Sequence, residues 1–180
     1  MDNTKFGYSE PVIACEIGCG YGGFAKLFKS WYPNATFIML DLPETLLLAS
    51  FFIASNFPKA RIGYMADFSQ KEVLSSERAK EYDFILLPWW YIENLTAKII
   101  DIYFNFSSMQ EMTLEFIRYY FEHIERTCRD GGYFYCESRL HNPLRYGGVS
   151  FKYFPFDKSW KIIYSQASEV IIEQIRYRGL

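Results

Sequence analysis

Hydrophobic and polar positions alternate along the chain between two patterns. Short apolar runs predict buried strands at residues 12–17, 36–40, 60–65, 83–87, 99–106 and 133–136. Longer segments carry apolar side chains at intervals of three and four, which predict helices on the surface of a core. Two further strands, 160–165 and 170–177, end the chain around a short polar turn. Alternating strands and helices closed by a hairpin predict an α/β protein with a mostly parallel sheet and helices on both faces.

Particular residues mark the helix boundaries. Pro43 suits the first turn of a helix that runs towards Asn56. Thr113 is the expected N-cap of a later helix, whose apolar stripe continues to Cys128. We expect the run Asp130-Gly131-Gly132 to end this helix, so that the following strand begins at Tyr133.

Composition and charge narrow the class of protein. A chain of 180 residues that is 50% hydrophobic can bury one core, so we expect a single domain over residues 1–180. Nineteen basic and 21 acidic residues give a net charge of −2, which argues against a general nucleic-acid binder. No apolar run is long enough to cross a bilayer, and the first residues lack the apolar core of a signal peptide. We therefore expect a cytoplasmic protein without a membrane span.

The four cysteines do not predict a metal site. Cys15, Cys19, Cys128 and Cys136 form no C-x-x-C pair, and the two histidines complete no zinc spacing. Reduced thiols packed in a core are the expected state of these side chains.

A glycine-rich loop follows the first predicted strand and opens the first helix. Gly18, Gly20 and Gly23 satisfy G-x-G-x-x-G, the spacing of a dinucleotide-binding turn. Asp41 ends the second strand 21 residues after Gly20, where an acid can bind ribose hydroxyls. This acid is compatible with an NAD-type ligand and with an adenosyl ligand, so it does not separate the two.

Glu16 favours one of these ligands. An acid two residues before the first glycine would repel a pyrophosphate and attract a cationic ligand. S-adenosylmethionine carries an ammonium and a sulfonium group, so the pattern E-x-G-x-G-x-G favours it over NAD. An NAD-binding oxidoreductase remains the alternative.

Five blocks of sequence resemble a known family. E-I-G-C-G-Y-G and D-L-P-E are similar to the class I, Rossmann-like S-adenosylmethionine-dependent methyltransferases. More narrowly, five blocks over residues 12–139 together resemble the sugar O-methyltransferase family: V-I-A-C-E-I-G-C-G-Y-G-G, D-L-P-E-T-L-L-L, L-L-P-W-W, S-M-Q-E-M and G-G-Y-F-Y. The resemblance implies a three-layer fold with a mostly parallel, seven-stranded sheet and a C-terminal antiparallel hairpin. It also implies methyl transfer to a hydroxyl of a sugar or glycan, with S-adenosylmethionine as cofactor.

The resemblance further implies a set of cofactor-binding residues. Glu16, Gly18, Gly20 and Gly22 would line the methionine part, Asp41 would hold the ribose, and Leu42 would pack beside the adenine. The full set is Glu16, Gly18, Cys19, Gly20, Tyr21, Gly22, Asp41, Leu42, Pro88, Trp89 and Asn105.

Two segments compete for the strand that follows the ribose-binding acid in such proteins. Residues 60–65 end at an acid, Asp67, whereas residues 83–87 lead into Pro88 and Trp89. The distance to the next strand favours 83–87, which makes 60–65 an additional strand. The rings of Trp89 and Trp90 would then flank the adenine or, alternatively, close the top of the core.

Candidates for the catalytic base follow the later strands. A sugar hydroxyl is a weak acid, so a base or a metal is needed. Glu111 precedes a helix and is the first candidate, although it could instead serve as a helix N-terminal acid or orient the substrate. His141, beyond the fifth parallel strand, is the second. A divalent ion on Glu111, Glu137 and His141 is a further alternative that no ligand spacing supports.

The sequence defines the residues that would bind the acceptor less clearly than those that would bind the cofactor. Residues 140–158 are rich in glycine and aromatics and predict either a wall for a sugar ring or a packed loop. The first strand begins about twelve residues into the sequence, so the helices that often cover the acceptor in this class are missing from it. We expect the chain to belong to a longer protein, to receive a lid from another chain or a second copy, or to be a non-catalytic relative.

Overall fold

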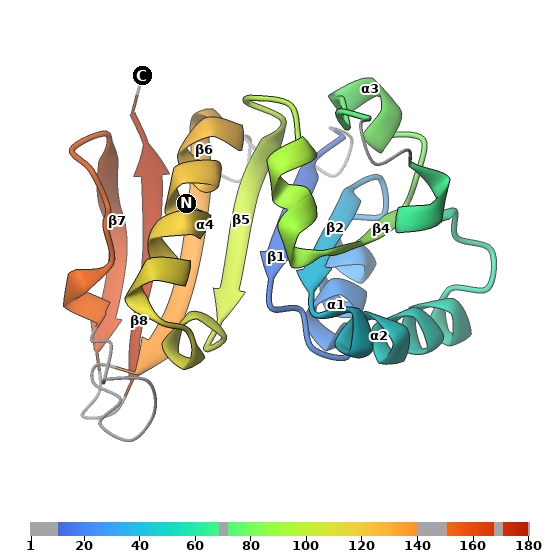
Figure 1. The fold of residues 1–180 in the computed structure, drawn as a ribbon, viewed down its shortest axis with the longest axis horizontal. Helices are drawn as coiled ribbons and strands as arrows, with labels where there is room; N and C mark the ends of the chain where they lie inside the picture. The colour runs from blue at the N-terminus through green and yellow to red at the C-terminus, as the bar shows by residue number, and fades with distance from the viewer. Residues whose placement is uncertain (1–10, 69–71, 140–150, 168–170, 180) are drawn as a thin grey trace.

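The computed structural model describes residues 11–68, 72–139, 151–167 and 171–179, and its centre is one eight-stranded sheet (Figure 1). The order across the sheet is β3-β4-β2-β1-β5-β6-β8-β7. The strands are β1 (Ile13–Ile17), β2 (Thr36–Asp41), β3 (Ile62–Tyr64), β4 (Phe84–Pro88), β5 (Ile100–Phe106), β6 (Cys128–Arg139), β7 (Trp160–Ala167) and β8 (Ile171–Arg178).

The sheet confirms the expected mostly parallel arrangement with an antiparallel C-terminal hairpin. β8 runs antiparallel to both β6 and β7, whereas the pairs from β3 to β6 are parallel. The strand count is eight rather than seven because the short β3 adds an edge. β4 pairs directly with β2, and β3 pairs only with β4, so residues 83–87 form the inner strand as expected.

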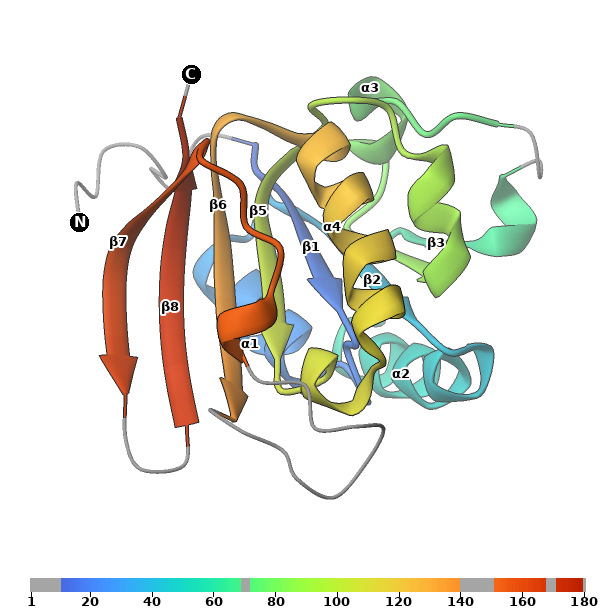
Figure 2. The same ribbon diagram turned by 60° about the vertical axis from the view of Figure 1, so that its left-hand side comes forward.

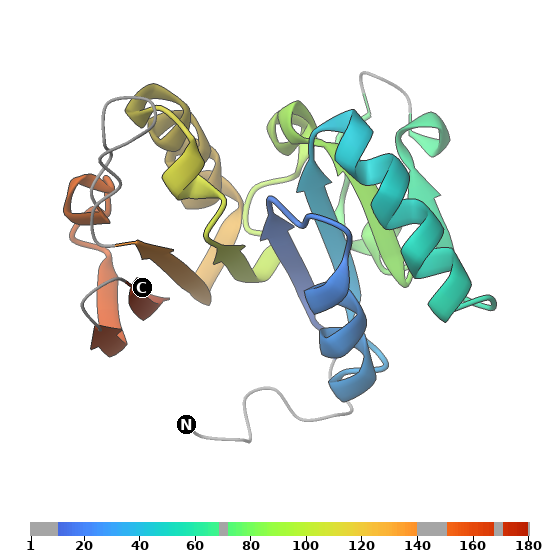
Figure 3. The same cartoon turned by 90° about the horizontal axis from the view of Figure 1, so that it is seen from below.

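Helices cover the sheet on two faces, and each face has its own hydrophobic core. Ala25 of α1 and Ile53 of α2 pack in one core, whereas Ile117 and Phe121 of α4 pack in the other. Figures 2 and 3 show α4 on the side of the sheet opposite α1 and α2. The helices are α1 (Gly23–Trp31), α2 (Pro43–Asn56), α3 (Ser76–Ala79) and α4 (Leu114–Thr127), with 3-10 turns η1 (Met65–Asp67), η2 (Trp89–Asn94), η3 (Met109–Glu111) and η4 (Phe151–Tyr153).

The helix starts agree with the sequence, but one helix end does not. Pro43 begins α2, and the hydroxyl of Thr113 accepts a hydrogen bond from the Phe116 amide at the start of α4. The expectation that Asp130-Gly131-Gly132 ends α4 is wrong, because α4 ends at Thr127 and β6 begins at Cys128. The glycines instead form an irregularity inside β6: Gly131 has a φ of +74°, and a Cβ on Gly132 would clash with Cys128.

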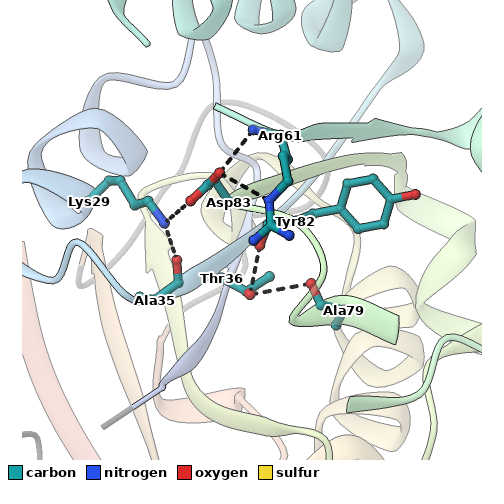
Figure 4. A network of polar contacts seen from close by, with 7 residues as sticks. All are labelled: Lys29, Ala35, Thr36, Arg61, Ala79, Tyr82 and Asp83. Atoms are coloured by element: carbon teal, nitrogen blue, oxygen red, sulfur yellow. Dashed lines mark hydrogen bonds and ion pairs between the residues drawn. The ribbon is translucent and has the colours of Figure 1, made fainter. Parts of the chain in front are cut away.

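A buried lysine joins three segments at the amino end of the sheet (Figure 4). Nζ of Lys29 lies 2.8 Å from a carboxylate oxygen of Asp83 and also donates to the Ala35 carbonyl. The other oxygen of Asp83 accepts a hydrogen bond from the Arg61 amide, and Thr36 donates to the Tyr82 carbonyl. Burial lowers the pKa of Lys29, and the hydrogen bond to Asp83 opposes this effect. These contacts hold α1 and the starts of β2, β3 and β4 together at the end of the sheet opposite the glycine loop.

The four cysteines are free and buried, as expected of packed thiols. In the described segments, no helix combines the length and the apolar character needed to span a membrane.

Candidate cofactor site

A cavity of about 580 Å³ lies at the carboxyl ends of the central strands. It is near β1, which has β2 on one side and β5 on the other, so the strand order reverses here. Open α/β sheets bind ligands at this position. The cavity is lined by Gly18, Gly20, Asp41, Leu42, Thr45, Trp89, Ser108, Glu111, Met112, Thr113, Phe116 and Tyr120.

The glycine loop after β1 forms one wall, and its conformation requires glycine. Gly18, Gly20 and Gly22 all have positive φ, at +74°, +55° and +90°. A Cβ on Gly18 would overlap the side chain of Ser108 in the loop after β5. A Cβ on Gly20 would meet no atom within 4 Å. Gly18 therefore allows two loops to touch, whereas Gly20 leaves open space at the cavity wall.

Asp41 connects this loop with the end of β2. Its Oδ2 accepts a hydrogen bond of 2.8 Å from the Gly20 amide, and its Oδ1 accepts one of 2.7 Å from the Leu42 amide. An ionised carboxylate can accept about four hydrogen bonds, so both oxygens keep free lone pairs. The carboxylate thus orients the loop and can still accept hydrogen bonds from a ligand in the cavity.

Glu16 is a buried acid next to this wall. The residue is 3% exposed, and its Oε2 has no hydrogen-bond partner among the residues that the structure describes. Burial, together with the smaller effect of the negative charge of Asp41, raises the pKa of Glu16 to about 8. A buried carboxyl without a partner is unfavourable in the free protein, and a nearby cation would relieve this cost.

The opposite wall is aromatic and comes from η2 and α4. The ring of Trp89 meets Phe116 edge-to-face at a centroid distance of 5.3 Å. Tyr120 lies one turn further along α4 and is 3% exposed. The Tyr120 hydroxyl makes no hydrogen bond to another described residue. Burial raises the pKa of Tyr120, and the charges of Tyr119 and Asp41 raise it in the same direction. This wall combines flat apolar rings with the Tyr120 hydroxyl, which makes no hydrogen bond within the described segments.

The loop after β5 is held from behind. Asn105 is fully buried and donates to the Ile17 carbonyl and to Oγ of Ser108. Ser108 in turn donates to the same carbonyl. Ser107, between them, has a φ of +61°, an uncommon conformation for a residue with a side chain. The fixed loop presents Ser108 and Glu111 to the cavity.

The structure brings six of the sequence-predicted residues to the cavity. These are Gly18, Gly20, Asp41, Leu42, Trp89 and Glu111. Six others lie outside its lining: Glu16, Cys19 and Gly22 are buried around the loop, Pro88 and Asn105 are buried at strand ends, and Tyr21 is 56% exposed against Phe52. His141 lies outside the described residues. Among the described residues, no three metal-ligating side chains group together, and Glu137 accepts a hydrogen bond from Ser107.

Sequence reasoning missed half of the lining. The missed residues are Thr45, Ser108, Met112, Thr113, Phe116 and Tyr120. One signal could have found two of them. Phe116 and Tyr120 are four residues apart in a helix that starts beside the site, so they lie on the same face of that helix.

Comparison with known proteins rests on structure alone. No protein-family model matches this chain, and no curated protein sequence matches it significantly. A solved S-adenosylmethionine-dependent methyltransferase from Methanosarcina mazei superposes with a TM-score of 0.66 at 13% identity, over 96% of this chain and 94% of the other.

Two further solved structures show the same arrangement. A methyltransferase of this type from Aquifex aeolicus gives a TM-score of 0.57 at 11% identity, over 97% of this chain and 86% of its own. The mitomycin 7-O-methyltransferase MmcR gives 0.63 at 14% identity, over 92% of this chain but 49% of that one. The fold is that of S-adenosylmethionine-dependent methyltransferases. At these identities the likeness establishes the fold, and the chemistry depends on the site.

Proposed function

We propose that the chain is an S-adenosylmethionine-dependent methyltransferase that acts on a hydroxyl of a sugar or glycan. The observation that carries the choice of cofactor is Glu16, a buried carboxyl beside the glycine loop whose Oε2 has no hydrogen-bond partner in the described part of the chain. A cationic ligand offsets the cost of burying this acid. S-adenosylmethionine fits because its methionine part carries two positive groups, and the shared fold supports the same cofactor.

The residues present can hold each part of this cofactor. Asp41 retains acceptor capacity for ribose hydroxyls, and the open space at Gly20 lets a ligand lie against the backbone. Leu42 and the aromatic ring of Trp89 offer apolar surface for an adenine. When bound, the cofactor supplies an electrophilic methyl group. We propose that Cys19, Tyr21, Gly22, Pro88 and Asn105 act indirectly, by supporting the residues that touch it.

Glu111 is the proposed base. It ends η3, three residues before α4 begins, and lies in the cavity lining, exposed to solvent. The side-chain amide nitrogen of Gln110 lies 3.5 Å from its Oε1. In this role it accepts the proton of the acceptor hydroxyl while the loop holds that hydroxyl in line with the methyl group. His141 remains the second candidate.

The NAD-binding alternative is not favoured. A pyrophosphate at the glycine loop would meet Asp41 in the cavity lining and lie close to Glu16, whose pKa the charge of Asp41 already raises. The similar solved structures are also methyltransferases.

The choice of a sugar acceptor rests on the sequence resemblance and on the aromatic wall, because aromatic rings pack against the apolar faces of sugars. The test is to incubate the protein with methyl-labelled cofactor and a panel of mono- and oligosaccharides, then locate the label by mass spectrometry. Label on a sugar oxygen, lost in Glu111→Gln, is the expected result. Label only on amines or on non-sugar hydroxyls would contradict the proposed acceptor.

A further inference from the structure

Tyr120 of α4 carries a hydroxyl that has no part in the proposed function so far. The residue lines the cavity and is 3% exposed, and its ring packs in the core beneath α4. Two polar side-chain atoms of the described residues are both sealed from solvent and without a hydrogen bond, Oε2 of Glu16 and Nε1 of Trp160. The Tyr120 hydroxyl also makes no hydrogen bond to a described residue, but it is not one of these sealed atoms. It therefore reaches the open space of the cavity, although the rest of the side chain is buried.

Two other hydroxyls of the cavity lining are already bonded within the protein. Ser108 donates to the Ile17 carbonyl, and the hydroxyl of Thr113 accepts from the Phe116 amide. The hydroxyl of Tyr120 has only the contents of the cavity to bond with. A ligand that fills the cavity displaces water from this hydroxyl, which must then bond to the ligand or stay unpaired at a cost.

Tyr120 lies towards the end of the cavity formed by β2 and β4. Trp89 directly follows β4, and Asp41, the last residue of β2, pairs in register with Pro88. The ring of Trp89 meets Phe116, which lies one turn before Tyr120 on the same face of α4. The carboxylate that helps to raise the pKa of Tyr120 is that of Asp41. The hydroxyl is therefore near the acid proposed for the ribose and the rings proposed for the adenine.

The proposed chemistry takes place at the other end of the cavity. Ser108 and Glu111 lie in the segment after β5. In the order β4-β2-β1-β5, three strand spacings, about 14 Å, separate the end of β4 from the end of β5. The acceptor hydroxyl would give up its proton to Glu111 at the β5 end. The position of Tyr120 thus favours a contact with the nucleoside part of the ligand over a contact with the reacting atoms.

We infer that the Tyr120 hydroxyl forms a hydrogen bond with the nucleoside part of the cofactor, which makes Tyr120 a further cofactor-binding residue. This inference rests on the proposed function, because it takes S-adenosylmethionine as the ligand of the cavity. A tyrosine hydroxyl both donates and accepts, so it can pair with a ribose hydroxyl or with a polar atom of the base. A ligand without a matching polar atom leaves the hydroxyl unpaired, so the bond also contributes to the selection of the ligand.

Calorimetric titration of the full chain with two ligands tests the inference. The ligands are S-adenosylhomocysteine and methylthioadenosine, which keeps the nucleoside but lacks the amino-acid part. Tyr120→Phe removes only the hydroxyl and should weaken binding of both ligands by the same factor, about 3- to 10-fold, the effect of one neutral hydrogen bond. Thermal unfolding of free Tyr120→Phe should occur at the wild-type temperature, since no described residue loses a hydrogen bond.

Tyr119→Phe is the matched control. Tyr119 is the preceding residue of the same helix, but its hydroxyl donates to Glu93 at 2.8 Å and the residue is outside the cavity lining. This variant also loses one hydroxyl and keeps its ring, and it should bind both ligands as wild type does. An equal loss of affinity in Tyr119→Phe and Tyr120→Phe would indicate a general effect on α4 and would overturn the inference.

The remaining outcomes separate this inference from the proposed function. If wild type binds S-adenosylhomocysteine and Tyr120→Phe binds it equally well, the role of Tyr120 is wrong and the cofactor assignment stands. A loss for S-adenosylhomocysteine alone would place the hydroxyl at the methionine part and would overturn the inference, as would a wild type that does not bind methylthioadenosine. A lower unfolding temperature of Tyr120→Phe would indicate a structural role instead. A wild type that binds neither ligand would refute the proposed cofactor and this inference with it.

Discussion

The Gly20 amide donates a 2.8 Å hydrogen bond to Oδ2 of Asp41, and this bond joins the loop after β1 to the end of β2. One carboxylate thus has two tasks in the proposed site: it holds the glycine loop in place, and it offers acceptors to the ribose. The two tasks can be separated by substitution.

Asp41→Ala should weaken binding of S-adenosylhomocysteine by about 10- to 100-fold, because it removes charge-assisted hydrogen bonds to the ribose. Asp41→Asn keeps an acceptor for the loop and should lose less. Asp157→Ala is the control: Asp157 also accepts a backbone hydrogen bond, from Ser159, but on the connection before β7. Calorimetric titration measures all three, and unchanged binding in Asp41→Ala would reject the ribose assignment.

Glu16 should make the stability of the free protein depend on pH. The pKa of Glu16 is about 8 in the folded chain against an ordinary value of 4.5. The folded state therefore holds the proton more tightly, so this contribution is full below pH 4.5 and is lost as the pH rises through 8. Urea unfolding of wild type should show stability falling across this window, by up to about 1.4 kcal/mol per pH unit relative to Glu16→Gln. Parallel profiles for the two proteins would contradict the raised pKa.

Glu16 should also make cofactor binding depend on pH, but here the affinity should rise with pH, whereas the stability falls. A cationic ligand binds best to the ionised Glu16, so binding of S-adenosylmethionine should tighten as the pH rises from 6 towards 8. Glu16→Gln should flatten this dependence. Titrations in two buffers of different ionisation enthalpy would detect the proton that wild type releases, and equal proton release in both proteins would exclude Glu16 as its source.

Two glycines of one loop should respond differently to alanine. Gly18→Ala adds a Cβ that overlaps Ser108, so it should destabilise the fold by about 3 kcal/mol or more. Gly20→Ala meets no neighbour and should cost about 1–2 kcal/mol for its positive φ. Its new methyl group instead fills open space at the cavity wall and should weaken cofactor binding. Thermal unfolding and calorimetry check the pair, and a reversed order would contradict the assigned roles.

Glu111→Gln should lower kcat by about 100-fold or more and leave cofactor binding intact, if Glu111 removes the acceptor proton. Glu115→Gln is a matched control, because Glu115 is an exposed acid in the first turn of α4 outside the cavity lining. A kcat that falls equally in both variants would indicate a general effect of helix charge.

The sequence predicts the fold well because the signals are local. Pro43 and Thr113 mark helix starts, and continuous apolar runs mark buried strands, so neither needs knowledge of the tertiary structure. The run at 130–132 misleads because glycines that end a helix also permit an irregularity inside a strand, and only pairing with β5 distinguishes the two.

The sequence predicted the cavity residues that follow the strand ends of one short segment, and it missed residues that a distant helix brings to the cavity. The glycine loop and Asp41 follow from strand ends and spacing, and both meet at the cavity. Phe116 and Tyr120 reach the cavity from α4. The apolar pattern of α4 in the sequence fits side chains packed in the core as well as side chains that line a cavity. Asn105 shows the reverse case, because it lies at the correct strand end but points into the core to hold Ser108.

Calorimetric titration of the purified chain with S-adenosylhomocysteine and, separately, with NAD is the most direct measurement. We expect a single site for S-adenosylhomocysteine, weakened by Asp41→Ala, and no binding of NAD. Binding of NAD without binding of S-adenosylhomocysteine would contradict a methyltransferase and would make the chain a dinucleotide-binding protein.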